Sequence, residues 1–575
     1  MDIANFPALS KDIQAFVERG QLGKDPVAAL YGDRRKAYNL FSNLLTDKEM
    51  ETLKPYLFCH GNRYAQTPSD KPTRVLNFIN GDWKVPSKGE FATLKSHADR
   101  RISLMEVPAS TPEDVEDAIS AADAYWKSLA WSEEVTTYRK FVINNFARLM
   151  DYFSEDCMRE IRQQIPKTRL EAQKDFFEAK RSADHIGGSF EAAVKGELLE
   201  PLQPGHVYWR NPYLPAGVSA IITPMNFIWG IPGIHLIGAY MAGVPYVFKG
   251  HPFAALSNTT MIRMLIAAGA DPRQIHKLEG FGSGIAGLAT DKRVAVVCLT
   301  GSSGTAKKIQ EGRGLGRLRF EGGGCNWAWV DDGYNDEELK KIAVRLSYAK
   351  LGFGSHKCTS LHGVSGSAAT LEKLEKYMLE EWSSWKAIDP RETTEEKVLS
   401  PLMVHKAQTL LDISEAGKKT KGITVLREGS KADGAYGEHS EACKPLMMRI
   451  QPDSTVSVNW DGKGVTELHL ATEEFFMPIL VTMEMKSFDD FVKFSLFKNP
   501  HDLAVSVWTR DDRKIQKGRK TLGGMLKEND GTDSALEWEE FGNSGIGDSG
   551  NMGVGEVTAT ISIYTRRQKG RHITF

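Results

Sequence analysis

A cysteine and a glutamate in this chain could together carry out covalent chemistry on a carbonyl group. Cys358 follows a glycine-bearing, turn-forming segment, 352–357, and Glu321 opens a run of three glycines, 322–324. A thiolate can attack a carbonyl carbon, and a carboxylate can then activate water against the acyl intermediate. The hypothesis requires that the elements around these two residues bring their side chains together.

Three neighbouring residues offer competing chemistry. Cys325 directly follows the glycine run, but it precedes the strand-like segment 326–330, which favours a packed thiol. Lys357 could lower the pKa of the adjacent Cys358 through its charge, although adjacent side chains often point apart. His356 could pair with Cys358 as in a cysteine hydrolase, but residues so close in sequence pair awkwardly and no orienting residue accompanies them.

Two glycine-containing turns could bind the phosphates of a dinucleotide. Gly282 begins a Gly-x-Gly-x-x-Gly sequence after the strand-like segment 274–279, but no acid follows about 20 residues later to hold a ribose hydroxyl. A turn that merely needs glycine is the alternative. Gly301 and Ser302 lie between the strand-like segment 294–299 and an expected helix. Free amides at a helix N-terminus attract phosphate, although such turns are also common without a ligand.

Two further polar residues follow expected strands. Asn226 lies in Thr-Pro-Met-Asn-Phe, 223–227, where its amide could donate to an oxyanion or simply support a turn. Lys249 ends the strand-like segment 244–249, at the edge where open α/β sheets bind ligands. A solvated lysine at a strand end is the alternative for Lys249.

The elements that must position these residues alternate between strand and helix. This alternation runs over 214–320 and again over 360–520, which is typical of parallel α/β sheets. Long amphipathic helices are expected over 111–200, and Asn80-Gly81 predicts a hairpin. Further helices are expected at 11–19, 47–56, 258–268 and 336–350, and further strands at 503–508 and 558–564.

Composition excludes several classes of protein. The chain of 575 residues is expected to form about two to four domains. Its net charge of −1 argues against nucleic-acid and membrane-surface partners. The six cysteines are single, without a CxxC pair, so we expect no metal site and a reducing, cytoplasmic location. The N-terminal sequence does not resemble a signal peptide, and no segment is expected to span a bilayer.

Taken together and in order, these motifs resemble the aldehyde dehydrogenase superfamily, over roughly 78–565. Within it, the Lys-Cys pair and the glycine-rich ending look closer to the pyrroline-5-carboxylate and ring-cleavage semialdehyde branches. The matching elements are Phe78-Ile-Asn-Gly-Asp-Trp, Thr223-Pro-Met-Asn-Phe, Lys249, Thr300-Gly-Ser, Phe320-Glu-Gly-Gly-Gly, Ser355-His-Lys-Cys and Glu473-Glu-Phe-Phe-Met-Pro.

The resemblance implies roles for individual residues. Cys358 would be the nucleophile, Glu321 the base and Asn226 the oxyanion donor, acting on a small-molecule aldehyde. The cofactor would be NAD or NADP, held by Thr223, Pro224, Lys249, Pro252, Gly282, Gly301, Ser302, Glu474 and Phe476.

This sequence departs from the family pattern at several of these positions. Pro252 stands where an acid would accept from the adenine ribose 2′-hydroxyl, so NADP could be accepted, and His251 could favour it. Cys325 replaces the usual lysine after the glycines, and Met477 replaces a glycine near the nicotinamide.

The resemblance also implies an α/β fold with two parallel-sheet domains and a small β oligomerisation flap. A helical extension, 1–75, would precede a nucleotide-binding domain, 76–320, to which 530–555 returns. The catalytic domain would be 321–529. The flap would combine 196–213 with 556–575, and would pair subunits into a homodimer or tetramer.

The implied reaction is oxidation of an aldehyde to the acid through a thiohemiacetal and a thioester on Cys358. One rival is a CoA-acylating enzyme of the same fold, which the presence of Glu321 disfavours. Another is a non-catalytic structural or binding protein on this scaffold. The substrate is not readable from the sequence: Phe227, Trp229 and Trp327 could wall its site, although aromatic residues more often pack in a core.

Overall fold

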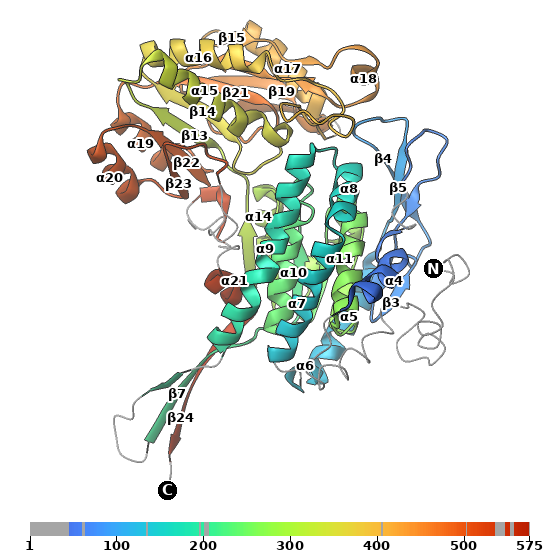
Figure 1. Ribbon diagram of the computed structural model, residues 1–575. Coiled ribbons are helices and arrows are strands. Elements are labelled where there is room, and N and C mark those ends of the chain that lie inside the picture. The colour runs from blue at the N-terminus through green and yellow to red at the C-terminus, as the bar shows by residue number, and fades with distance from the viewer. Residues whose placement is uncertain are drawn as a thin grey trace.

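Two α/β lobes and a projecting β arm form the structure, which is a computed structural model (Figure 1). Each lobe is built on a seven-stranded, mostly parallel sheet, as expected from the alternation of strands and helices. The structure describes residues 45–59, 64–133, 136–194, 197–199, 206–403, 406–501, 503–534, 547–551 and 557–573. The expected helix at 11–19 lies outside these residues.

The sheet of the first lobe has the order β12-β11-β8-β9-β10-β2-β3. All its neighbouring strands are parallel except at β2, which is antiparallel to both β10 and β3. Asn80 and Gly81 join β2 to β3 with φ values of 53° and 84°, the left-handed turn predicted for this pair. The strands are β2 (Asn77–Ile79), β3 (Asp82–Lys84), β8 (Ser219–Ile222), β9 (Tyr246–Lys249), β10 (Ile275–Lys277), β11 (Val296–Thr300) and β12 (Arg317–Glu321).

Helices cover this sheet and supply the largest apolar core. Thr111 and Asp114 form a capping box at the start of α5, with Pro112 in the first turn, as the sequence indicates. The helices are α4 (Asp47–Leu57), α5 (Pro112–Lys127), α6 (Ala130–Glu133), α7 (Thr136–Tyr152), α8 (Ser154–Gln164), α9 (Arg169–Val194), α10 (Gly230–Ala242), α11 (Ala255–Ala268), α12 (Gly282–Ile285), α13 (Gly287–Thr290) and α14 (Ser303–Arg313), with a 3₁₀ turn η3 (Pro252–Ala254).

The sheet of the second lobe has the order β15-β18-β21-β14-β13-β22-β23, and only the β15–β18 pair is antiparallel. Its strands are β13 (Asn326–Val330), β14 (Leu361–Gly366), β15 (Thr424–Arg427), β18 (Leu446–Arg449), β21 (Ile479–Glu484), β22 (Ala504–Trp508) and β23 (Met525–Glu528). Its helices are α15 (Asp336–Leu351), α16 (Ala368–Trp382), α17 (Lys406–Lys419), α18 (Gly434–His439), α19 (Phe488–Phe497) and α20 (Asp512–Thr521).

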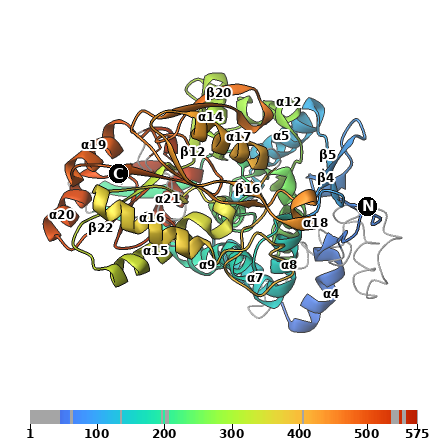
Figure 2. The same cartoon turned by 90° about the horizontal axis from the view of Figure 1, so that it is seen from above.

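Small sheets connect the lobes and form the arm. The loop between β4 (Phe91–Lys95) and β5 (Ser103–Pro108) reaches α18 of the second lobe, where the Arg100 amide donates to the His439 carbonyl at 2.8 Å (Figures 1 and 2). The loop therefore links the lobes on the side opposite the arm. The arm consists of β6 (Glu197–Leu199), β7 (His206–Pro215) and β24 (Thr565–Ile573).

One sequence prediction in this region is wrong. Residues 558–564 were expected as a strand because they are rich in β-branched residues, but they lie in helix α21 (Val557–Tyr564), and β24 begins only at Thr565. The helix packs on α10, where Tyr564 hydrogen-bonds to His235 at 2.6 Å and Thr560 faces Gly238. Burial against a neighbouring helix has overridden local strand propensity.

Candidate active site

A cavity of about 630 Å³ brings together the two residues that carry the chemical hypothesis. Cys358, in the loop before β14, and Glu321, at the end of β12, both line it. Helix α9 and the turn before α10 supply other walls, including Phe177 and Phe227. The two candidate residues therefore come from different lobes and line one cavity where the lobes join.

The loop that carries Cys358 has an unusual backbone. Phe353, Gly354 and Ser355 have φ values of 60°, 58° and 67°. All three lie in the left-handed region, which residues other than glycine rarely adopt. The Ser355 hydroxyl donates to the Lys350 carbonyl at 2.6 Å, which ties the turn to α15. Such strain persists only where surrounding contacts hold it, and it is typical of pre-organised sites.

Asn326, the first residue of β13, fixes the other end of this loop. Its Nδ2 donates to the carbonyl oxygens of Cys358 at 2.7 Å and Ser360 at 2.8 Å, while its Oδ1 accepts from the Ala504 amide at 2.9 Å. The buried side-chain amide of Asn326 thus holds the backbone at Cys358 against the sheet.

The glycine run after Glu321 allows three segments to approach closely. A β-carbon on Gly323 would lie 1.9 Å from a Glu474 carboxylate oxygen, and one on Gly324 would lie 2.5 Å from the Cys358 carbonyl oxygen. The Gly324 amide also donates to Glu474 at 3.3 Å. A side chain at either position would push apart the glycine run, the loop of Cys358 and Glu474.

Burial controls the ionisation of the reactive groups. It raises the pKa of the Cys358 thiol well above its ordinary value, and the nearby Glu321 carboxylate adds to this effect. Burial also raises the pKa of Glu321 to about 7, against a weak hydrogen bond from Thr300 Oγ1 at 3.4 Å. Near neutral pH the thiol is therefore protonated, while the carboxyl group is poised to exchange a proton.

Asn226 lies beside the cavity rather than in its wall. It follows β8, its side chain is 3% exposed, and its Oδ1 has no hydrogen-bond partner among the described residues. The next residue, Phe227, lines the cavity, and its ring stacks on Phe353 at 5.1 Å between centroids. The turn predicted as an oxyanion site therefore borders the nucleophile loop.

A buried ion pair that sequence reasoning missed holds this turn. Lys167 Nζ pairs with Asp175 at 2.9 Å and donates to the Asn226 carbonyl at 2.5 Å. The Asp175 carboxylate also accepts from the amides of residues 228, 229 and 230 at 2.9–3.1 Å, which caps α10. No local pattern indicates this role, because the partners lie about 50 residues away.

Glu171 is a second missed residue, and here a signal was available. Thr168 and Glu171 form the reciprocal hydrogen bonds of a capping box, whose Thr-x-x-Glu spacing is visible in the sequence. The same carboxylate accepts from the Phe353 amide and from the Ser400 hydroxyl. The helix cap thereby supports the strained loop of the nucleophile.

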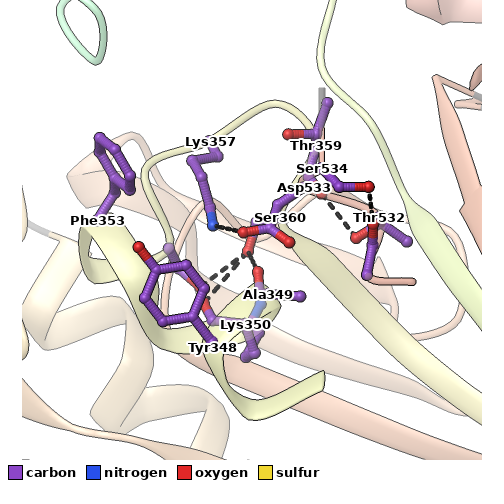
Figure 3. A network of polar contacts seen from close by, with 12 residues as sticks. Tyr348, Ala349, Lys350, Phe353, Lys357, Thr359, Ser360, Thr532, Asp533 and Ser534 are labelled. Atoms are coloured by element: carbon purple, nitrogen blue, oxygen red, sulfur yellow. Dashed lines mark hydrogen bonds and ion pairs between the residues drawn. The ribbon is translucent and has the colours of Figure 1, made fainter. Parts of the chain in front are cut away.

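The three competing interpretations of neighbouring residues are settled by contacts. Cys325 is fully buried and its thiol donates to the Ala471 carbonyl at 3.3 Å, so it is a packed thiol. Lys357 Nζ pairs with Asp533 at 2.6 Å, as Figure 3 shows, and burial rather than this lysine governs the thiol pKa. Burial lowers the pKa of His356 to about 3, and its ring contacts Phe476 rather than lining the cavity.

Several of the predicted cofactor residues gather at the carboxyl edge of the first sheet. Thr223 and Pro224 follow β8, Lys249 ends β9, and Gly301 and Ser302 follow β11. The Thr223 amide donates to the Lys249 carbonyl at 3.2 Å, and Ser302 caps α14 by accepting from the Thr305 amide at 3.3 Å.

This edge fits a nucleotide. The Thr223 hydroxyl is buried without a hydrogen-bond partner among the described residues, and α14 presents its N-terminus there. Glu474 and Phe476 approach from the second lobe, and Phe476 has a left-handed φ of 54°. The N-terminus of α14 could therefore bind a phosphate, Glu474 could accept from a ribose hydroxyl, and Phe476 could pack on a ring of the nucleotide.

Two predicted cofactor residues have a different setting. Gly282 starts α12 in open space with a φ of 30°, which favours glycine through the backbone, whereas at Gly284 a β-carbon would lie 2.3 Å from the Ser110 carbonyl oxygen. The second glycine of the Gly-x-Gly-x-x-Gly sequence, Gly284, therefore lets α12 pack closely against the backbone at Ser110. Pro252 is buried in η3, with no acid in its place.

The aromatic residues divide between wall and core. Phe227 lines the cavity, whereas Trp229 and Trp327 are fully buried in the cores of the first and second lobes.

Within the described part of the chain, each helix is too short or too polar to cross a lipid bilayer.

Comparisons with known proteins agree with this geometry. Residues 84–569 match the model of the aldehyde dehydrogenase family. The chain is 22% identical to malonate-semialdehyde dehydrogenase 1 of Geobacillus kaustophilus, over 86% of this chain and 97% of that protein. It is 25% identical to alpha-ketoglutaric semialdehyde dehydrogenase of Bacillus subtilis, over 72% of this chain and 81% of that protein.

Solved structures show the same fold. Betaine aldehyde dehydrogenase from Staphylococcus aureus, in complex with NAD+, superimposes with a TM-score of 0.77 at 18% identity, covering 86% of this chain and 94% of that one. PnpE in complex with nicotinamide adenine dinucleotide also gives 0.77, at 19% identity, covering 87% and 97%.

Proposed function

The chain belongs to the aldehyde dehydrogenase family of NAD(P)-dependent enzymes, and on this premise we propose that it oxidises an aldehyde to its carboxylic acid at Cys358. The observation that carries the proposal is the shared cavity, because Cys358 and Glu321 line it together from different lobes. The first lobe would bind the nucleotide and the second would present the nucleophile.

The first step is attack of the Cys358 sulfur on the aldehyde carbon, which forms a thiohemiacetal. Because burial holds the pKa of the thiol high, the sulfur starts with a proton, which it loses on attack and which ends on the oxygen of the thiohemiacetal. Asn226 and the Cys358 backbone amide would donate to the developing oxyanion. The strained turn at 353–355 and the Asn326 bonds keep the nucleophile in place during attack.

When bound, NAD(P)+ would supply the hydride acceptor, held by Lys249, Gly301, Ser302, Glu474 and Phe476. Loss of hydride from the carbon of the thiohemiacetal and of the proton from its hydroxyl group to solvent would leave a thioester on Cys358. Glu321 would then take a proton from water as the water attacks the thioester, which releases the acid and the thiolate. Its pKa of about 7 suits this transfer at neutral pH.

Acceptance of NADP is part of the proposal. No acid stands at Pro252 to repel a 2′-phosphate, and the Lys249 ammonium lies at the same strand end. Burial and the Lys249 charge lower the pKa of His251 to about 3, so a neutral His251 adds no charge to this preference.

The arm of β6, β7 and β24 would join subunits into a dimer or tetramer.

The direct test is a panel of aldehydes with NAD+ and with NADP+, followed by the absorbance of the reduced cofactor. Cys358→Ala should lower kcat by about a thousandfold or more. Cys325→Ala is the matched control, because it removes the rival thiol and should keep turnover. Activity retained in Cys358→Ala would refute the proposal, and a product that forms only with CoA would favour the acylating rival.

A further inference from the structure

We propose that the aldehyde carries an anionic group, a carboxylate or a phosphate, at the far end of an apolar linker, and that Lys174 on α9 binds this group. The inference rests on the proposed function and adds the class of substrate. It follows from how charge is distributed along the walls of the cavity.

One face of α9 forms a wall of the cavity at helical spacing. The side chains on this face of α9 are apolar, cationic and acidic. Lys174 is exposed, whereas Glu321, near the thiol, is 2% exposed. Lys174 therefore lies toward solvent from the reacting groups. The α9 residues in the wall are Leu170, Gln173, Lys174, Phe177, Glu178 and Arg181.

The other walls are largely apolar. Phe227 and Phe353 stack on each other, and Ile231 and Ile234 on α10 line the same space. Such walls accept methylene groups, and the four apolar side chains offer no hydrogen-bond partner to a polar linker that packs against them. The part of the substrate between its two ends is therefore apolar.

Two other cationic side chains in the cavity wall are already paired with carboxylates. Arg345 and Lys357 also line the cavity, and both pair with Asp533, at 2.7 and 2.6 Å (Figure 3 shows the Lys357 pair). Arg345 also pairs with Asp530 at 2.6 Å, so Asp530 and Asp533 together balance these two cations.

Lys174 has a neutral partner instead. Its Nζ donates to the Tyr348 hydroxyl at 2.8 Å, and burial raises the pKa of that phenol, so it stays uncharged. Among the described residues, no carboxylate lies within ion-pair distance of Lys174 Nζ. Partial burial of its ammonium group and the nearby Lys357 lower the pKa of Lys174, and an anion beside it would favour the charged form.

Negative charge lies around the thiol. Glu321, Glu474 and Glu178 all raise the pKa of the Cys358 thiol through their charges. A substrate tail with a negative charge is therefore repelled from the thiol and attracted toward Lys174. This arrangement orients an anionic aldehyde with its carbonyl group at the nucleophile.

The experiment compares short ω-oxo carboxylic acids and ω-oxoalkyl phosphates with the neutral methyl esters of the same acids. The wild-type enzyme should have a higher kcat/KM for an anionic aldehyde than for the ester, and salt should reduce that preference. Whichever of the two, the carboxylic acid or the phosphate, gives the higher kcat/KM identifies the anionic group of the substrate. Lys174→Met should lower the preference about 10- to 100-fold, the range of one charge-assisted contact, and Lys174→Arg should retain most of it.

Lys376→Met is the matched control, because Lys376 is also an exposed helical lysine beside a tyrosine ring, 5.9 Å from Tyr377, but outside the cavity. It should leave the preference unchanged. Equal use of acids and esters by the wild type, or an unchanged preference in Lys174→Met, would overturn the inference while the proposed function stood. If no aldehyde reduced either cofactor, the proposed function itself would fail.

Discussion

Glu321→Gln should separate the two halves of the proposed reaction. The amide cannot take a proton from water, so thioester hydrolysis should slow by about 10²- to 10⁴-fold. Thioester formation does not use this group, so rapid mixing with aldehyde and NAD(P)+ should show a burst of reduced cofactor close to one equivalent per site. Steady-state turnover should then be slow, and hydroxylamine should release the trapped acyl group.

The pH dependence follows from the pKa of about 7. The base acts only when ionised, so about a tenth of Glu321 is active at pH 6 and about nine tenths at pH 8. In the wild type, the hydrolysis rate should rise through this window and level off above it. In Glu321→Gln the remaining slow rate should not show this rise.

The same shift has a consequence for stability. The folded carboxyl group has its pKa raised from 4.5 to about 7 and is 2% exposed. Below about pH 4.5 both states hold the proton, whereas between about 4.5 and 7 only the unfolded state has lost it. Wild-type stability should therefore fall as the pH rises through this range, by about 3 kcal/mol in total. Glu321→Gln should remove this dependence and be the more stable protein at pH 8.

Glu160→Gln is the matched control. Burial also raises the pKa of Glu160 to about 7, but this residue hydrogen-bonds to Tyr64 and Thr260 and does not line the cavity. Denaturation at several pH values should show that Glu160→Gln, like Glu321→Gln, loses the fall in stability with rising pH. Rapid mixing with aldehyde and NAD(P)+ should show no burst of reduced cofactor in Glu160→Gln. Normal steady-state turnover in Glu321→Gln, or a hydrolysis rate that does not vary with pH between 6 and 8, would refute the role of Glu321.

Three other substitutions test the supports of the site. Asp175→Ala leaves Lys167 as an unpaired buried charge, so chemical denaturation should show a loss of about 3–5 kcal/mol, and an unchanged midpoint would contradict this. Gly323→Ala places a methyl group 1.9 Å from the Glu474 carboxylate, so Kd for NAD(P)+ measured by calorimetry should rise about tenfold, whereas unaltered affinity would separate Glu474 from the cofactor. Pro252→Glu should shift the ratio of kcat/KM toward NAD+ over NADP+ about tenfold or more, and a constant ratio would exclude contact with the 2′ position.

The chemistry-bearing residues and most of the elements could be predicted because their signals are local. Strand and helix periodicities, the Asn80-Gly81 turn and the cap before α5 depend on residues a few positions apart. The exception is 557–564, where β-branched residues form a helix because α10 buries them. A local propensity near 1 kcal/mol cannot compete with burial of a whole apolar face.

The partners of the reactive groups could not be predicted in the same way. Lys357 is next to Cys358 in the sequence, yet its charge is paired with Asp533, which lies 176 positions away. Asp175 and Asn326 likewise act on backbone groups that the fold brings to them. Electrostatic and hydrogen-bond energies depend on distance in space, and separation along the chain carries no information about that distance.

The order of residue types along this chain therefore specified which groups could react: a thiol, a carboxylate, an amide and a lysine, each at the end of a predictable element. Only the tertiary structure decided their environment, because two lobes must close on each other before water is excluded. That exclusion raises the pKa of Glu321 to about 7 and holds Cys358 protonated. Side chains of both lobes also form the cavity wall, which has carboxylates near the thiol and the exposed Lys174 farther toward solvent.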